Sequence, residues 1–281
     1  MIARYKEEPT LRDVYVEGQF DASVLKDYLL AQDGCDDVVV YEIDTVDVTA
    51  TMLIENDLDG GQKGRVIAAC LAFSAALGDT PQVTGIVDRD YDNVRNIRYE
   101  CPLLLFTDYA CMEMYSFTEP VLGRFFRLFV RRTEFTPSRF IAAVRMVLIE
   151  AFLMRAANQE KGYALKWLEV EEQCKVTLDK AEFDVADFVQ KYLNKSAKLK
   201  HRDEFNFQLE LFRASIAGQD ERHCINGHDF VGMLAKYILK SVSNKNLADT
   251  DVVERQLVAH LDFKALASEP MFLELLNRVR R

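Results

Sequence analysis

The chain has 281 residues, of which 49% are hydrophobic and 28% are charged, and its formal net charge at pH 7 is −10. This is the composition of an ordinary folded globular protein, and the negative charge argues against a protein that coats nucleic acid without specificity. No apolar run approaches the roughly 20 residues that span a bilayer, and residues 1–10 lack the apolar core of a signal peptide, so we expect a cytoplasmic protein without a membrane partner.

The first part of the chain alternates between short strands and helices. Residues 13–17 are β-prone and end on Glu17, and a helical pattern then runs to about Gly34. Three further segments read as strands of nearly continuous apolar character: 37–43, 82–88 and 102–108. Residues 47–54 fit either a strand or an insertion, and the glycine-rich loop 59–64 precedes another helix. This alternation predicts an α/β fold with a mostly parallel sheet flanked by helices.

Helical patterns dominate after about residue 118. Apolar residues recur at helical spacing in four segments: 120–132, 137–157, 184–194 and 229–240. Residues 204–212 alternate like a strand although their neighbours favour helix, and both interpretations stay open. We therefore expect an α/β domain over residues 1–118 and a predominantly helical domain over residues 119–281.

Charged residues are unevenly distributed. Residues 33–59 hold nine acids and no Lys or Arg, whereas a basic stretch at 191–202 holds no acid. The cations of this stretch are Lys191, Lys195, Lys198, Lys200 and Arg202, beside His201. A second basic group consists of Arg124, Arg127, Arg131 and Arg132. Each group is either a solvated helix face or a surface that contacts phosphates.

The cysteines do not form a metal-binding or disulfide pattern. All six are scattered without a CxxC pair, so buried reduced thiols are expected. His223, Cys224 and His228 could be taken for a metal cluster, but a turn before a helix is the better interpretation.

Several acids follow the predicted strands. Glu17, Asp88 and Asp108 each stand at a strand end, where ligands bind in parallel α/β sheets. Asp90 is two residues beyond Asp88, so an extended backbone would direct both carboxylates the same way. If the strands of Glu17 and Asp88 are neighbours, the clustered acids raise one another's pKa values unless a cation is bound. Oxygen ligands without His or Cys suit Mg²⁺ or Mn²⁺.

These motifs resemble a known family. VYVEGQFD, followed roughly seventy residues later by TGIVDRDYD, resembles the TOPRIM fold of topoisomerases, bacterial primases and OLD-type nucleases. Within that group the chain looks most like the AriB subunits of PARIS anti-phage systems and their relatives. TDYACMEMY at 107–115 resembles their threonine–aspartate motif, and INGHDFVGML at 225–234 resembles their Gly-His-Asp helix start.

The resemblance implies a set of site residues. The implied metal ligands are Glu17, Asp88, Asp90, Asp108 and Glu113, with Asp92 as a candidate outer ligand. Lys63 would lie near the substrate phosphates, and Glu17 would act as ligand or general base beside Asp88 and Asp90. In the alternative interpretation, Glu17 caps the next helix and the other two are turn acids.

The resemblance also implies a function. We expect a Mg²⁺- or Mn²⁺-dependent nuclease that acts as a toxic effector in anti-phage defence. RNA, with tRNA as a candidate, is the expected substrate, bound with the help of Lys195, Lys198, Lys200 and Arg202. An ATPase subunit would hold the nuclease inactive, and the released form would be a homodimer. The alternative is a non-catalytic α/β interaction subunit of an ATPase assembly.

Overall fold

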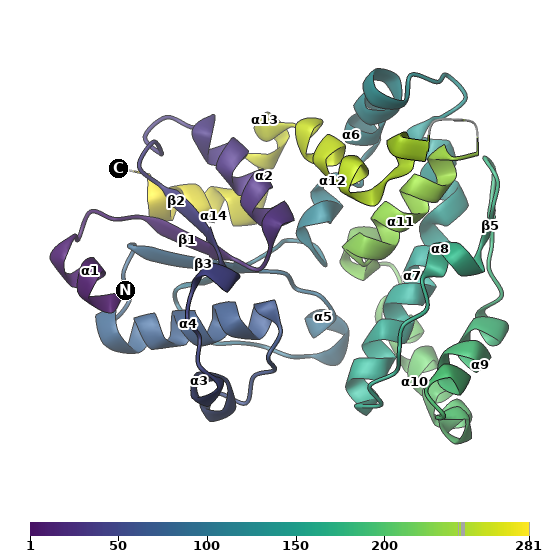
Figure 1. Ribbon diagram of the computed structural model, residues 1–281, viewed down its shortest axis with the longest axis horizontal. Helices are drawn as coiled ribbons and strands as arrows, with labels where there is room; N and C mark the ends of the chain where they lie inside the picture. Colours follow the sequence, from purple (N-terminus) through teal and green to yellow (C-terminus); the bar gives the residue numbers. More distant parts are fainter. Residues whose placement is uncertain (241, 243–244, 281) are drawn as a thin grey trace. The chain divides into compact units, whose positions relative to one another are not determined.

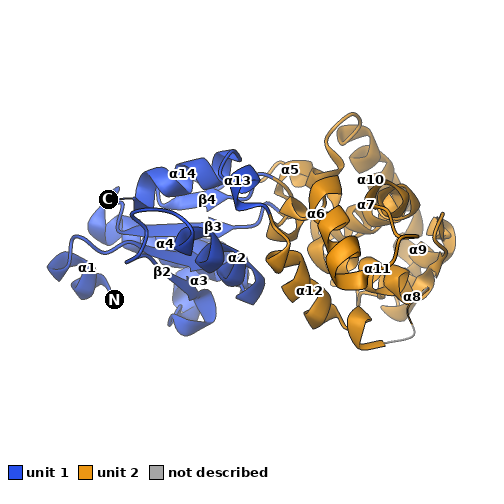
Figure 2. Cartoon of the chain, turned by 90° about the horizontal axis from the view of Figure 1, so that it is seen from above, with its two compact units in different colours: residues 1–89, 98–108, 262–281 blue, residues 90–97, 109–261 orange. Residues whose placement is uncertain are grey.

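The structure is a computed structural model that describes residues 1–240, 242 and 245–280. The chain forms two compact units (Figure 2). Unit 1 comprises residues 1–89, 98–108 and the segment that begins at Asp262, and unit 2 comprises residues 90–97 and 109–261. Both units are thus discontinuous in sequence. The division at residue 118 stays a prediction, since these units are defined by contacts and not by independent folding.

Unit 1 is built on a four-stranded parallel sheet, which confirms the α/β class predicted from the sequence. The strand order is β2-β1-β3-β4, and β1 lies beside β3 with Tyr15 opposite Gly85. The strands are β1 (Asp13–Val16), β2 (Val39–Glu42), β3 (Val83–Val87) and β4 (Leu104–Phe106). Each strand lies within one of the apolar segments that predict it.

Helices cover both faces of this sheet (Figure 1). Helix α4 lies on one face, and α2 and α14 lie on the other, where the ring of Tyr28 packs edge-on against Phe272 at a centroid distance of 4.7 Å. The helices of unit 1 are α1 (Ile2–Glu7), α2 (Gln19–Leu30), the 3₁₀ turn η1 (Ile43–Thr45), α3 (Ala50–Glu55), α4 (Gln62–Leu77), α13 (Phe263–Leu266) and α14 (Pro270–Val279).

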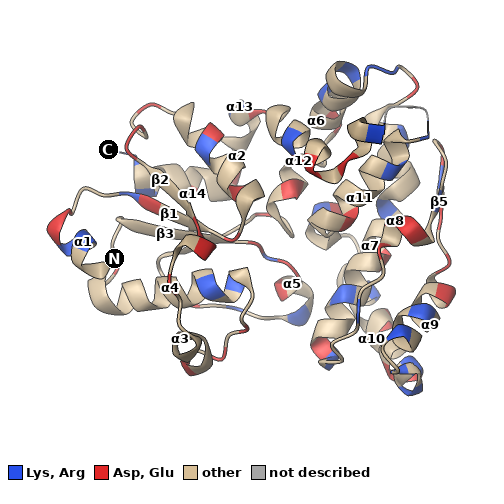
Figure 3. Cartoon of the chain, viewed as in Figure 1, with Lys and Arg blue, Asp and Glu red and all other residues tan. Residues whose placement is uncertain are grey.

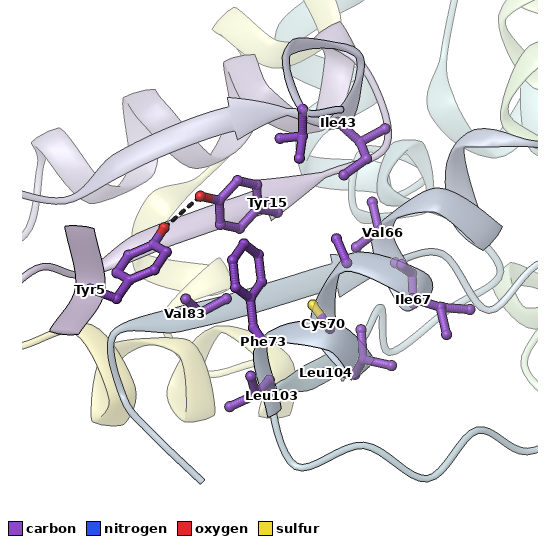
Figure 4. Packing of buried hydrophobic residues seen from close by; sticks show 13 residues of the cluster. Tyr5, Tyr15, Ile43, Val66, Ile67, Cys70, Phe73, Val83, Leu103 and Leu104 are labelled. Atoms are coloured by element: carbon purple, nitrogen blue, oxygen red, sulfur yellow. Dashed lines mark hydrogen bonds between the residues drawn. The ribbon is translucent and has the colours of Figure 1, made fainter. Parts of the chain in front are cut away.

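A buried cluster joins α4 to the sheet (Figure 4). Phe73 of α4 stacks on Tyr15 at a centroid distance of 5.6 Å and meets Tyr5 edge-on at 5.5 Å. The hydroxyl of Tyr5 donates to Asp13 at 2.8 Å and lies 2.5 Å from the hydroxyl of Tyr15, whose hydrogen it can accept. Burial raises the pKa of the Asp13 carboxyl. This polar network anchors α1 at the amino-terminal edge of the sheet.

Close packing of α4 on β3 explains Gly85. A Cβ atom at this position would lie 2.3 Å from Cys70 Sγ and 2.9 Å from Leu104 Cδ2. Such distances are far below van der Waals contact, so the helix can approach the strand only where the side chain is missing. The isolated glycine in the strand pattern therefore marks the closest helix–strand contact.

Unit 2 is mainly helical. Its 25-residue helix α7 packs against α10 and α11, and Arg155 of α7 binds buried Asp229 of α11 through two hydrogen bonds of 2.8 Å. The helices are α5 (Asp92–Arg95), η2 (Met112–Tyr115), α6 (Glu119–Arg124), the π-helix η3 (Phe125–Val130), α7 (Pro137–Lys161), α8 (Val170–Gln173), α9 (Val185–Lys195), η4 (Leu199–His201), α10 (Arg202–Ser215), η5 (Glu221–Cys224), α11 (Gly227–Ile238), η6 (Lys245–Ala248) and α12 (Thr250–Ala259). A short hairpin pairs β5 (Lys175–Val176) with β6 (Ala181–Glu182).

The structure resolves the two ambiguous segments as helices. Residues 47–54 contain the start of α3, and residues 204–212 lie inside α10. The alternating pattern in α10 arises because Phe207 and Leu211 are exposed apolar residues on the helix face opposite its buried residues, among them Leu209. In the part of the chain that the structure describes, no helix has both the length and the apolar character to cross a membrane.

Candidate functional site

Glu17 and Asp88 come together at the carboxyl ends of two neighbouring strands. Glu17 directly follows β1, Asp88 directly follows β3, and these strands pair in parallel. The backbone N–H of Asp88 donates a hydrogen bond of 2.8 Å to Glu17 Oε1. The strands of Glu17 and Asp88 are thus neighbours, a condition that the sequence left open. The N-cap of α2 is Gly18, whose N–H donates to Asp21 at 3.2 Å.

The loop that carries Asp88 is fixed by hydrogen bonds to the next strand end. The N–H of Arg89 donates to Thr107 Oγ1 at 3.1 Å, and Arg89 Nε donates to the carbonyl oxygen of Thr107 at 2.7 Å. Thr107 is fully buried just beyond β4. Its hydroxyl and carbonyl therefore hold both the backbone and the side chain of the residue that follows Asp88.

Lys63 approaches the same loop from α4. Its Nζ donates a hydrogen bond of 3.1 Å to the carbonyl oxygen of Arg89 and lies 6.0 Å from the ring centre of Tyr99. The preceding turn is tight, because a Cβ on Gly64 would lie 2.3 Å from the carbonyl oxygen of Asp59. The glycine-rich turn thus brings a cation to the loop of Asp88.

Asp90 does not continue the strand as expected. Its φ of 48° is in the left-handed region, so the prediction that an extended backbone directs Asp88 and Asp90 to the same side is wrong. β3 ends at Val87 and the chain then turns. Asp90 belongs to unit 2, where its N–H donates to the carbonyl oxygen of Ala110 at 2.7 Å. Asp92 begins the short helix α5. A metal role for either residue stays a prediction.

Asp108 has a structural partner. Both of its carboxylate oxygens accept the N–H of Met271, at 3.1 and 3.2 Å, in the first turn of α14. The N-cap residue of that helix, Glu269, provides no side-chain cap of its own. Asp108 thus caps α14 although it is far from this helix in sequence. A carboxylate stabilises a helix N-terminus because the first N–H groups lack partners within the helix and the helix dipole is positive there.

This capping role makes a prediction about stability. Replacing Asp108 with Ala should lower the free energy of unfolding by about 1 kcal/mol, as the loss of a cap usually does. Asp108→Asn, which keeps an acceptor oxygen, should lose much less. Urea unfolding of both variants measures the difference. Unchanged stability of Asp108→Ala together with abolished Mn²⁺ binding would instead identify Asp108 as a ligand.

Glu113 lies in unit 2, in the turn η2, and is only 8% exposed. Its carboxylate lies against Gly227, where a Cβ would be 2.3–2.5 Å from its atoms. Gly227 is the first residue of α11, which explains the glycine of the Gly-His-Asp helix start. Burial raises the pKa of the Glu254 carboxyl, and the charge of Glu113 raises this pKa further.

The predicted nucleic-acid stretch occupies the end of α9, the turn η4 and the start of α10, and acids accompany its cations (Figure 3). Lys191 pairs with Asp187 at 2.7 Å, and Lys195 donates to the carbonyl oxygen of Trp167 at 2.9 Å. Lys198, Lys200 and Arg202 form no ion pair with a residue in the described ranges. These three residues are therefore the cations of the stretch that are best able to bind a phosphate.

Neutralising these cations tests the stretch. Lys198→Gln with Lys200→Gln should weaken single-stranded RNA binding regardless of sequence, and should reduce the slope of log K against log salt by about 0.7 for each phosphate that the variant no longer neutralises. Lys6→Gln with Lys26→Gln is the control, since it removes the same charge from exposed positions in unit 1. Equal RNA binding by both double variants would mean that the basic stretch is a solvated surface that does not contact RNA.

The described residues contain no gathered cluster of the implied metal ligands. Within residues 1–240, 242 and 245–280, no group of three or more His, Cys, Asp or Glu side chains is arranged to hold an ion. Glu17 and Asp88 offer oxygen donors only, a set that fits Mg²⁺ with most of its water shell, because this ion commonly uses one or two carboxylates plus substrate phosphate. The expected turn at His223 and Cys224 is confirmed as η5, which ends two residues before the N-cap of α11.

The sequence indicated Thr107 only as part of the threonine–aspartate motif and assigned it no role. Its role depends on the position of Arg89, in the loop that follows the neighbouring strand β3. No protein-family model matches the chain, and no curated protein matches it. The residues of the candidate site are therefore defined by their geometry alone.

Proposed function

We propose that the protein is a divalent-metal-dependent nuclease whose reaction takes place at Glu17 and Asp88. The observation that carries this proposal is the hydrogen bond of 2.8 Å between Asp88 N–H and Glu17 Oε1, which joins two carboxylate-bearing strand ends at the edge where α/β proteins bind ligands. The same bond keeps the carboxylate of Glu17 at the backbone of Asp88, so a cation bound at this edge would meet oxygen donors from both strand ends.

The chemistry assigned to the chain is phosphodiester cleavage. A bound Mg²⁺ or Mn²⁺ would polarise the scissile phosphate. Glu17 would orient or deprotonate the attacking water, and Asp88 would hold the cation. The ammonium of Lys63, kept at the Arg89 carbonyl, would offset phosphate charge. The bonds from Thr107 to Arg89 would keep Asp88 in place through the reaction, which favours catalysis because a preorganised site needs no rearrangement.

The biological setting extends the same proposal. The resemblance to TOPRIM nucleases, and to the AriB subunits of PARIS systems in particular, supports a cytoplasmic toxic effector that an ATPase subunit restrains and that dimerises when released. It also supports RNA, including tRNA, over DNA as substrate. Asp90 would join the site as part of the DxD motif.

A second function has specific support. Asp108 caps α14 and Glu113 packs against Gly227, so two of the five implied metal ligands have structural roles. A non-catalytic interaction subunit of an ATPase assembly would need only these roles. Purified protein incubated with Mn²⁺ and a panel of tRNA, single-stranded RNA and duplex DNA separates the two functions. Cleavage that a chelator stops supports the nuclease, and intact substrates throughout the panel support the interaction subunit.

A further inference from the structure

A π-helix lies between α6 and the turn that precedes α7. It spans Phe125–Val130 and ends at Arg131, which has a φ of 57° and whose N–H donates to the carbonyl oxygen of Phe126 at 2.8 Å. Arg131 Nε donates to the carbonyl oxygen of Leu128 at 3.1 Å, so the side chain folds back over the helix end. π-helices are rare and frequently occur at functional sites. The last residues of this π-helix and Arg131 line a cavity.

The cavity has a volume of about 490 Å³. Residues 128–131 line one side, Leu247 of η6 lines another, and Gln256 and His260 of α12 complete it. None of these residues is acidic, although the chain has a net charge of −10. By contrast, the larger groove beside α7 is lined by Glu150, Asp220 and Glu221. The π-helix cavity is therefore suited to an anion, and its volume is in the range of small-molecule sites.

The arginine that lines this cavity, Arg131, is unpaired among the described residues, as are Arg127 and Arg132 close to it in sequence. Arg127, Arg131 and Arg132 are exposed, and none of them forms an ion pair with a residue that the structure describes. Some arginines of unit 2 are paired, as Arg139 is with Asp179 at 2.7 Å and Arg213 is with Glu150. Guanidinium groups bind phosphate oxygens through strong charge-assisted hydrogen bonds.

Aromatic rings complete the lining. Phe129 and His260 both pack around buried Phe125, with centroid distances of 5.2 and 6.1 Å from its ring. His260 Nδ1 lies 2.6 Å from the carbonyl oxygen of Gln256, which fixes the orientation of the imidazole. Aromatic rings beside arginines are the combination on which proteins stack nucleobases while holding the phosphate.

We propose that this cavity binds a nucleoside phosphate, with the phosphate at Arg131 and the base against Phe129 and His260. The ligand is either a free nucleotide or one nucleotide of a single strand, which share this chemistry. The inference concerns binding alone and does not depend on cleavage at Glu17 and Asp88.

Binding is measured on the full chain in the presence of EDTA, so that no metal-dependent cleavage occurs. The probes are uridine monophosphate, followed by calorimetry, and a short fluorescent oligouridylate, followed by anisotropy. Arg131→Gln should weaken binding about tenfold, the usual effect of removing a hydrogen bond to a charged group. Phe129→Leu should weaken it about fivefold or more, because the base can no longer stack on the ring. For the oligonucleotide, Arg131→Gln should also reduce the salt slope by about 0.7.

Arg255→Gln is the matched control, because Arg255 is an exposed arginine on α12 that does not line the cavity. Arg131→Lys keeps the charge and should retain part of the affinity, and thermal unfolding checks that each variant is folded. Equal affinity for both probes would identify a free nucleotide as the ligand of the cavity. Tighter binding of the oligonucleotide would identify a nucleotide within a single strand as the ligand. Unchanged affinity in Arg131→Gln, or no binding of either probe by the wild type, would overturn the inference whatever the nuclease assay shows.

Discussion

Glu17→Gln should abolish nucleic-acid cleavage while the protein remains folded. The glutamine Oε1 can still accept the N–H of Asp88, so the bond of 2.8 Å that joins β1 to the loop after β3 is preserved. Only the charge is removed. Loss of a positioned general base typically lowers the rate 10²–10⁴-fold, and weaker metal binding would add to this. The rate is measured on the substrate that the wild type cuts.

The control for this experiment is Glu55→Gln, which removes the same charge from an exposed position on α3. This variant should cleave like the wild type. We expect Glu17→Gln to unfold close to the wild-type midpoint without metal, because the amide oxygen still accepts the N–H of Asp88. Cleavage at the wild-type rate in Glu17→Gln would remove Glu17 from the reaction and favour the interaction subunit.

Mn²⁺ should stabilise the folded protein. An ion that binds the native state at about a hundred times its dissociation constant adds roughly 2.7 kcal/mol to the free energy of unfolding. Thermal unfolding at increasing Mn²⁺ concentration therefore gives a rising Tm. Asp88→Asn should abolish most of the rise, since it leaves only one carboxylate at the two strand ends.

Asp33→Asn serves as the control, because Asp33 is an exposed acid of unit 1 beyond the end of α2. Its Tm should rise with Mn²⁺ as in the wild type. An equal rise in wild type, Asp88→Asn and Asp33→Asn would mean that the ion binds elsewhere, and the assignment of the metal to Glu17 and Asp88 would then fail.

The strands, and the places of Glu17 and Asp88 at strand ends, could be predicted because both depend on local pattern. The pairing of β1 with β3 could not, because it brings together distant residues, as Glu17 and Asp88 are 71 positions apart. Apolar runs separated by helical patterns define parallel strands, and an acid directly after such a run must lie at the carboxyl edge. The left-handed conformation of Asp90 could also have been predicted, since Asp adopts positive φ more readily than most residues. An extended backbone was the wrong choice because the strand had already ended.

Asp108 and Glu113 could not be interpreted from the sequence. The partner of Asp108 is Met271, which is 163 residues away, and the fit of Glu113 against Gly227 is a matter of packing between distant segments. An acid after a strand looks the same whether it binds a metal or caps a helix. The alternation at 204–212 misled for a related reason, because Phe207 and Leu211 are exposed. The missing information in each case was the residue's environment in the folded chain: a distant partner for Asp108, packing for Glu113, and exposure for Phe207 and Leu211.

The capping of α14 by Asp108 has a consequence for how the chain is made. The segment that begins at Asp262 belongs to unit 1, where Phe272 packs against Tyr28, yet it leaves the ribosome after residues 109–261. Because domains generally fold as their sequence emerges, unit 1 stays incomplete while unit 2 is synthesised. The face of the sheet that α14 covers would meanwhile be open to chaperones, and the carboxylate of Asp108 would find its partner in α14 only late in translation.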